Sequence, residues 1–259
     1  MNKLFGVALA ALMALGAHAA DAKEWTKIRM ATEGAYAPFN YVKPDGELAG
    51  FDVDIAKALC AEMKAECTIV KQDWDGMIPA LLARKYDAIV ASMSITEERK
   101  ERVDFTDKYY HTPARLVAKT GAGIVATAEG LKGKKIGVQR ETIHDKYATD
   151  NWSDSVEIVR YGTQDEANLD LVAGRVDAIL ADMVVLSEGF LKTDQGKGYE
   201  FTGPEFNDPK WFGPGAGIAV RKQDKDLTEQ LNKAIAAIRA NGTYDAIAKK
   251  YFDFNVYGS

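Results

Sequence analysis

The stretch AIVASMSITEER, residues 88–99, decides the architecture, because an apolar strand, a polar turn and a helix follow one another within it. Residues 88–90 form an apolar run that is typical of a buried strand. Thr96 is a residue type that caps helix N-termini, and two acids follow it. In such a junction the free backbone N–H groups and the positive helix end both favour an anion. The stretch therefore predicts an anion-binding turn at the end of a strand.

Arg99 lies in the first turn of this predicted helix, where the helix dipole mildly disfavours a cation. A guanidinium binds a carboxylate through two parallel hydrogen bonds, which gives Arg99 a possible function there. A solvated surface arginine is the simpler interpretation of this residue taken alone.

Two more strands are predicted upstream, at residues 28–32 and 68–70, with helices at 51–64 and 78–82. Asp52 is interpreted as the cap of the first helix. Alternation of strands and helices is typical of a parallel sheet, whose ligands bind beyond the C-terminal ends of the strands. Side chains at these ends are expected to converge, which favours the carboxylate-binding role of Arg99. The residues that follow strands in this way are Glu33, Tyr36, Trp74, Ser92, Ser94 and Arg99.

A second series of elements begins with a predicted strand at residues 135–139 and a polar loop at 140–144. Within it, residues 173–183 (AGRVDAILADM) repeat residues 83–93 (ARKYDAIVASM), with six of eleven positions identical. Such a repeat indicates two similar α/β lobes with a cleft between them. The match places Asp182 at the position of Ser92. An arginine on one lobe and an acid on the other could bind the two opposite charges of a zwitterion. The alternative interpretation of Asp182 is that it caps the N-terminus of a helix.

Two extended crossings between the lobes are predicted near residues 111–114 and 207–214. The second crossing is followed by a strand at 215–220, an amphipathic helix at 227–241 and a last short helix at 244–252.

The chain has 259 residues, of which 47% are hydrophobic and 27% charged, and a formal net charge of −5. This charge argues against nucleic acid or an anionic membrane as the main partner. A positive start, an apolar run and the A-x-A site at 17–19 predict a secretory signal peptide over residues 1–19. Cleavage takes away the charge of Lys3, so the formal net charge changes from −5 to −6. We expect an exported, soluble protein.

The two cysteines, Cys60 and Cys67, form an even count in an exported chain, which suggests a disulfide. Two buried free thiols are the alternative. Their spacing does not fit a metal site, and outside the leader only His111 and His144 are available as histidine ligands. We therefore expect no metal and no cofactor.

Several motifs together resemble the polar-amino-acid family of bacterial extracellular solute-binding proteins, in particular the branch that binds histidine, lysine, arginine and ornithine for ABC importers. The resemblance covers essentially the whole chain. The motifs are YAPF at 36–39, GFDVDI at 50–55, SIT at 94–96, SEGFL at 187–191 and KKYFDF at 249–254.

The resemblance implies a type II periplasmic-binding-protein fold, in which two lobes with parallel-rich sheets and flanking helices are joined by two hinge strands. Lobe 1 is then expected at residues 24–111 plus 214–259, and lobe 2 at 112–213. It also implies a periplasmic monomer that closes on one amino acid, delivers it to an inner-membrane ABC permease and catalyses no reaction.

The resemblance also assigns roles to residues. By this resemblance, Arg99 and the turn of Ala91, Ser92, Met93 and Ser94 bind the ligand's carboxylate. Asp182 binds its ammonium. The ring residues are Tyr36 and Trp74, and the acid that reads the ligand's side chain is Glu33. The second-lobe loop contributes Gln139, Thr142, Ile143 and His144, and the Cys60–Cys67 pair matches the family's disulfide.

The chain departs from that branch where Glu33 replaces an aspartate, Ala91 a serine, and Trp74 a smaller ring or a leucine. Gln139 and His144 also differ. Glu33 and Trp74 resemble the opine-binding branch, whose ligands carry a guanidinium. We expect arginine as the ligand, with lysine, ornithine and histidine as other candidates and an octopine-type opine as the alternative.

Two other classes of protein are considered. Related folds include exported cyclohexadienyl dehydratases, but the candidate residues offer no nucleophile–base pair. A sensor or adhesin domain is usually joined to a membrane segment or a further domain, and this chain ends soon after Phe254. A binding protein of a transporter is therefore the preferred interpretation.

Overall fold

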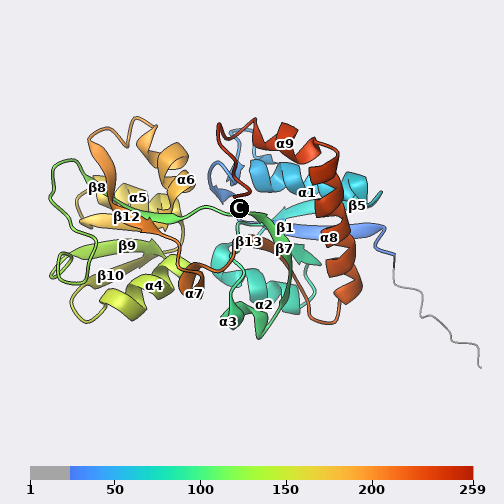
Figure 1. Cartoon of the computed structure of the whole chain (residues 1–259), viewed down its shortest axis with the longest axis horizontal. Coiled ribbons are helices and arrows are strands. Elements are labelled where there is room, and N and C mark those ends of the chain that lie inside the picture. Colours follow the sequence, from blue (N-terminus) through green and yellow to red (C-terminus); the bar gives the residue numbers. More distant parts are fainter. Residues whose placement is uncertain (1–23, 259) are drawn as a thin grey trace, which may run out of the picture.

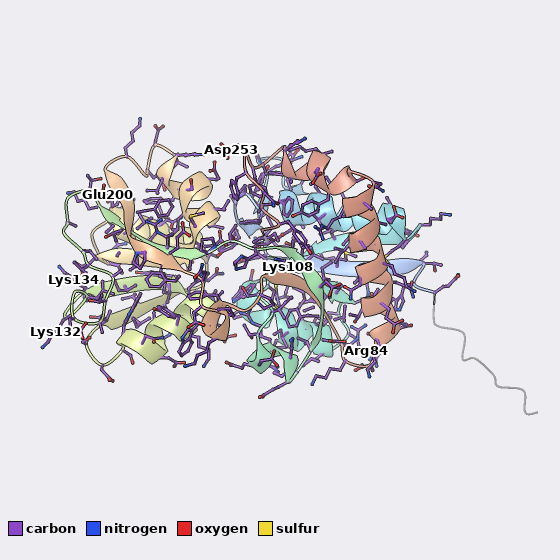
Figure 2. All side chains as sticks on the ribbon, viewed as in Figure 1. Arg84, Lys108, Lys132, Lys134, Glu200 and Asp253 are labelled. Carbon is purple, nitrogen blue, oxygen red and sulfur yellow. A yellow bond between two sulfur atoms is a disulfide. The ribbon has the colours of Figure 1, made fainter. Side chains whose placement is uncertain are left out.

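The structure, a computed structural model, consists of two five-stranded sheets that lie in separate lobes (Figure 1). It describes residues 24–258, so the predicted signal peptide lies outside the described residues. Charged side chains lie at the outer surface of both lobes (Figure 2): Lys132, Lys134 and Glu200 on one, Arg84 and Asp253 on the other.

The sheet of lobe 1 has the order β5-β1-β6-β13-β7. Strand β1 is parallel to β5 and β6, whereas β13 is antiparallel to β6 and β7. The sheet is therefore mixed, with a parallel half that carries the predicted strand ends. The bounds are β1 Lys27–Thr32, β5 Glu66–Lys71, β6 Ala88–Ile89, β7 Asp104–Tyr110 and β13 Ala216–Val220.

Helices cover both faces of this sheet (Figure 1). One face carries α1 (Phe51–Glu62), α8 (Lys225–Ala240) and α9 (Thr243–Ala248), which enclose a core that includes Ile28, Met30, Leu59 and Leu231. The other face carries the 3₁₀ turn η1 (Trp74–Gly76), α2 (Met77–Leu82) and α3 (Glu97–Lys100). A small antiparallel sheet is formed by β2 (Ala35–Tyr36), β3 (Asn40–Val42) and β4 (Leu48–Ala49).

Lobe 2 repeats this plan, with the order β10-β9-β11-β8-β12 and the same change from parallel to antiparallel pairing after the third strand. The repeated sequence leads into β6 in one lobe and β11 in the other, and both strands are third in their sheets. The strands are β8 Ala114–Lys119, β9 Lys135–Gln139, β10 Glu157–Tyr161, β11 Ala178–Asp182 and β12 Tyr199–Phe206. The helices are α4 Ile143–Trp152, α5 Gln164–Val172, α6 Met183–Leu186, the π-helical η2 Ser187–Leu191 and α7 Pro209–Phe212.

The chain passes between the lobes twice, from β7 to β8 and from β12 to β13 (Figure 1). We propose the expected lobe boundaries, 111/112 and 213/214, at these passages. The second passage is not extended throughout, because Asp208 caps α7 and Pro209 occupies its first turn.

The prediction that Asp52 caps α1 is wrong. The cap position belongs to Gly50, whose φ of 117° and close approach to the Phe39 carbonyl exclude a side chain. The Asp52 carboxylate points into lobe 1 and accepts hydrogen bonds from Asn40 Nδ2 (2.8 Å), Ser92 Oγ (2.9 Å) and the Tyr109 hydroxyl (2.8 Å). Asp52 thus joins α1 to the turn after β6.

The Cys60–Cys67 disulfide is present and ties the last turn of α1 to the start of β5. Within residues 24–258, no helix has both the length and the apolar character needed to cross a bilayer.

The disulfide is expected to add about 2–3 kcal/mol to the free energy of unfolding, because it restricts a short loop of the unfolded chain. The Cys60→Ser/Cys67→Ser double variant should lose that amount in urea denaturation. Intact mass after alkylation checks the bond itself: no label should be added without reductant and two labels after reduction. Two labels without reductant would refute the bridge.

Candidate ligand-binding site

A cavity lies where the C-terminal ends of the lobe 1 strands face the start of α4 in lobe 2. Both lobes contribute to its wall, as expected for a cleft between them. Lobe 1 provides Glu33, Tyr36, Trp74, Ala91, Ser92, Ser94 and Arg99, and lobe 2 provides Gln139, Thr142, Ile143 and His144. Eleven of the thirteen ligand-binding candidates from the sequence line this cavity.

A second cavity of about 360 Å³ adjoins the first and shares part of its wall, including Tyr36, Ser94 and His144. Asp182 lines this second cavity, so the structure brings it to the same region as Arg99. The remaining candidate, Met93, lies elsewhere: its side chain is 2% exposed and packs into the core of lobe 1.

The second cavity also contains residues that were not among the site candidates, and most belong to the two passages between the lobes. The predicted positions of the two passages could have indicated these residues, because a chain that joins two lobes must run beside the cleft. They are Tyr110, His111, Thr112, Ala114, Phe212, Gly215 and Ala216.

Arg99 is held by backbone carbonyls. Its side chain donates to Ser94 O (2.9 Å) and to Glu141 O in lobe 2 (3.3 Å), and its Cζ lies 5.3 Å from the centre of the Trp74 ring. In the part of the chain that the structure describes, no carboxylate forms an ion pair with this guanidinium. Burial lowers the pKa of Arg99 to about 10, so the group is still charged at neutral pH. A half-buried cation without an ion-pair partner favours an anion in the cavity.

Asp182 is the N-cap of α6, which was the alternative interpretation of this residue. One carboxylate oxygen accepts from the N–H groups of Val184 (2.8 Å) and Val185 (3.2 Å), and the other accepts from the Thr112 hydroxyl. Burial raises the pKa of Asp182 to about 6. Because this carboxylate also lines the second cavity, capping and ligand contact are compatible.

Glu33 lines the first cavity but not the second and is 3% exposed. Gln139 Nε2, from lobe 2, donates to Glu33 Oε1 at 2.6 Å and to Gly162 O at 3.1 Å. Burial raises the pKa of Glu33 to about 7. The two adjoining cavities thus have a cation from α3 and two buried acids, which come from the ends of β1 and β11.

The two lobes are in contact around the cavity. Besides the Glu33–Gln139 and Arg99–Glu141 hydrogen bonds, Arg140 of lobe 2 forms a 2.6 Å ion pair with Asp75 of lobe 1. On the other side, η2 packs so closely on lobe 1 that a Cβ at Gly189 would lie 3.0 Å from Ala37 O. With these contacts, the two lobes are closed over the cavity.

His144 is buried beside Arg99, and its ring packs at 6.2 Å from that of Phe212. Burial, together with the positive charge of Arg99, lowers the pKa of His144 to about 3. Its imidazole is therefore neutral at physiological pH. Among residues 24–258, no group of three or more His, Cys, Asp or Glu side chains is arranged to hold a metal ion.

Comparison with known proteins gives one consistent result. Residues 28–254 match the family described as bacterial extracellular solute-binding proteins, family 3. The chain is 55% identical to the L-arginine-binding protein of Pseudomonas aeruginosa over 99% of this chain and 98% of that protein. It is 49% identical to the histidine-binding periplasmic protein of Escherichia coli K12 over 89% of each. Among solved structures, an ancestral arginine-binding protein bound to arginine superposes with a TM-score of 0.82 at 36% identity, over 89% of this chain and all of that one.

His144 is expected to stay neutral down to about pH 5, because its pKa is far below the usual value of about 6.5. Since the unfolded chain takes up that proton and the folded chain does not, His144 lowers stability as the pH falls below about 6.5. The NMR shift of its ring protons should not change between about pH 8 and about pH 5. A midpoint near 6.5 would contradict the burial argument, and the half-buried His111 serves as an internal comparison.

Proposed function

Since this chain belongs to family 3 of the bacterial extracellular solute-binding proteins, we propose that it is the periplasmic substrate-binding component of an ABC importer for basic amino acids, with arginine as its preferred ligand. The observation that carries the proposal is the set of buried and half-buried charges around one cleft. Arg99 and Asp182 lie on different lobes, and Glu33 lines the first cavity but not the second.

The head group of an amino acid suits the Arg99–Asp182 side of the cleft. Its carboxylate provides the anion that the Arg99 guanidinium needs, through charge-assisted hydrogen bonds. The hydroxyl of Ser94 lines the same wall and offers a further donor, whereas that of Ser92 donates to Asp52. Its ammonium suits the buried Asp182 carboxylate in the second cavity.

The side chain of the ligand then extends towards Glu33. Tyr36 and Trp74 line the path, and a flat guanidinium gains about 0.5–2 kcal/mol from an aromatic face. An ammonium is more strongly hydrated and cannot stack, so lysine and ornithine should bind more weakly than arginine. A neutral imidazole would leave an ionised Glu33 buried without a cation, which is costly.

An octopine-type opine is a second candidate ligand. The observation in its favour is the second cavity, which adjoins the first near the expected head group. A second carboxylate of such a conjugate would extend towards its lining residues His111 and Phe212.

We propose that the closed arrangement is the form that an inner-membrane permease recognises. A ligand that touches both lobes favours closure, because it contributes contacts that the open form lacks. A catalytic role has no support in the site. Ser92 Oγ donates to Asp52, and the lowered pKa of His144 makes it a poor base.

Replacing Arg99 by alanine should weaken arginine binding by roughly 30-fold or more, because removal of one partner of a buried charge pair costs about 2–5 kcal/mol. Calorimetric titration measures the change. Arg102→Ala is the matched control, since Arg102 is an exposed arginine three positions further along the chain. Near-native affinity in a folded Arg99→Ala protein would remove Arg99 from the site.

The preferred ligand can be tested by thermal-shift screening of the twenty amino acids, ornithine, citrulline and octopine. Arginine should give the largest shift, ornithine and lysine smaller ones, and glutamate none, because its side-chain carboxylate would face Glu33. A larger shift with octopine would select the second candidate. A largest shift with an acidic amino acid would contradict the proposal.

A further inference from the structure

Glu33 is a buried carboxyl group whose surroundings contain little compensating charge. On its own lobe it faces Tyr36 of β2, and also Lys71 and Asp73 at the end of β5. From lobe 2 it faces Gln139 of β9 and Asp165 of α5. Within the described residues, no cation forms an ion pair with Glu33, and the two aspartates repel its charged form. A bound cation would therefore stabilise the ionised form of Glu33.

The contact with Gln139 leaves one part of Glu33 for the ligand. The Gln139 side-chain amide has two N–H bonds, and these are directed at Glu33 Oε1 and Gly162 O. Gln139 therefore fixes one carboxyl oxygen, while the other, Oε2, remains for a side chain in the cavity. When Glu33 is ionised, Oε2 only accepts hydrogen bonds. When Glu33 is protonated with the proton on Oε2, that atom donates one.

We propose that Glu33 selects the ligand's side chain according to its own protonation: the ionised form binds a cationic side chain such as that of arginine, and the protonated form binds a neutral amide or ureido side chain such as that of glutamine or citrulline. This inference rests on the proposed function. Arginine binding to protonated Glu33 releases that proton to solvent, whereas citrulline binding retains it as a hydrogen bond to the ligand's carbonyl oxygen.

Burial raises the pKa of Glu33 to about 7, so both forms are present near neutral pH in the ligand-free protein. Below that pH, arginine must displace a proton, and its affinity should fall by up to about tenfold per pH unit. Citrulline instead needs the proton on Glu33, so its own affinity falls as the pH rises above that value. Its affinity relative to arginine therefore rises as the pH falls.

Other groups in the cleft titrate in the same range, and the choice of ligands removes their effect. Burial raises the pKa of Asp182 to about 6, and His111 also lines the second cavity. Both lie near the α-amino and α-carboxyl groups, which arginine and citrulline share. Their protonation changes the two affinities alike and cancels in the ratio of arginine affinity to citrulline affinity.

The test is a calorimetric titration of the full-length mature protein with arginine and with citrulline between about pH 5 and about pH 8, at constant ionic strength. The affinity ratio should fall at least tenfold from the upper to the lower pH. Near pH 6, titrations in buffers of different ionisation enthalpy should show close to one more proton released with arginine than with citrulline.

Two variants locate the effect. Glu33→Gln, which cannot ionise, should bind citrulline better than arginine at every pH, with a constant ratio. Asp165→Asn is the matched variant: it removes a repelling charge near Glu33 without touching the carboxyl group, so the pKa of Glu33 should fall and the ratio of arginine affinity to citrulline affinity should be higher than in the unaltered protein at the same pH.

A constant ratio in the unaltered protein, with both ligands bound, overturns the inference and leaves the proposed function standing. A ratio that still changes with pH in Glu33→Gln overturns it as well, because another group must then be responsible. If no basic amino acid binds at any pH, the proposed function itself fails.

Discussion

The buried carboxylate of Asp52 holds the turn after β6, on which the proposed ligand contacts depend. It collects hydrogen bonds from three segments that are far apart in the chain, through Asn40, Ser92 and Tyr109. Ser92 has a positive φ of 55°, which a residue with a side chain adopts only when its surroundings hold it. The same turn supplies the Ser94 carbonyl that positions the Arg99 guanidinium. The structure thus gives a physical reason for the aspartate in the GFD motif.

The charged groups of the cleft are each held by polar partners that do not neutralise them. Arg99 is bound by carbonyls, Asp182 by N–H groups and a hydroxyl, and Glu33 by an amide. The partners of Arg99 and Asp182 within their own lobes fix these two side chains before a ligand arrives, so binding does not have to order them, whereas Gln139 reaches Glu33 from the other lobe. The opposite charges are then left for the ligand, and this favours a zwitterion with a charged end over an apolar molecule of the same size.

Residues that follow parallel strands could be placed from the sequence, because the alternation of strands and helices sends their side chains to one edge. The repeat likewise led from Ser92 to Asp182.

Three features depend on contacts that a local pattern does not contain. Asp52 looks like a helix cap until Asn40 and Tyr109 are brought to it; Met93 turns into the core between two residues that line the cavity; and Thr112 reaches Asp182 from seventy positions away. The sequence pattern did not indicate the antiparallel half of each sheet. Its paired strands, β7 with β13 and β8 with β12, are separated by most of a lobe along the chain.

The contact of Gly189 with the Ala37 carbonyl has a consequence for how binding specificity can change. At this point the lobes meet main chain to main chain, with no side chain that could shift to accommodate a larger residue. At this point the approach of the lobes is limited by a pair of residues outside both cavity walls. A side chain added at Gly189 would press on the Ala37 carbonyl, and closure over any ligand would then stop slightly earlier. Evolution thus has a way to admit larger ligands that leaves every residue in contact with the ligand unchanged.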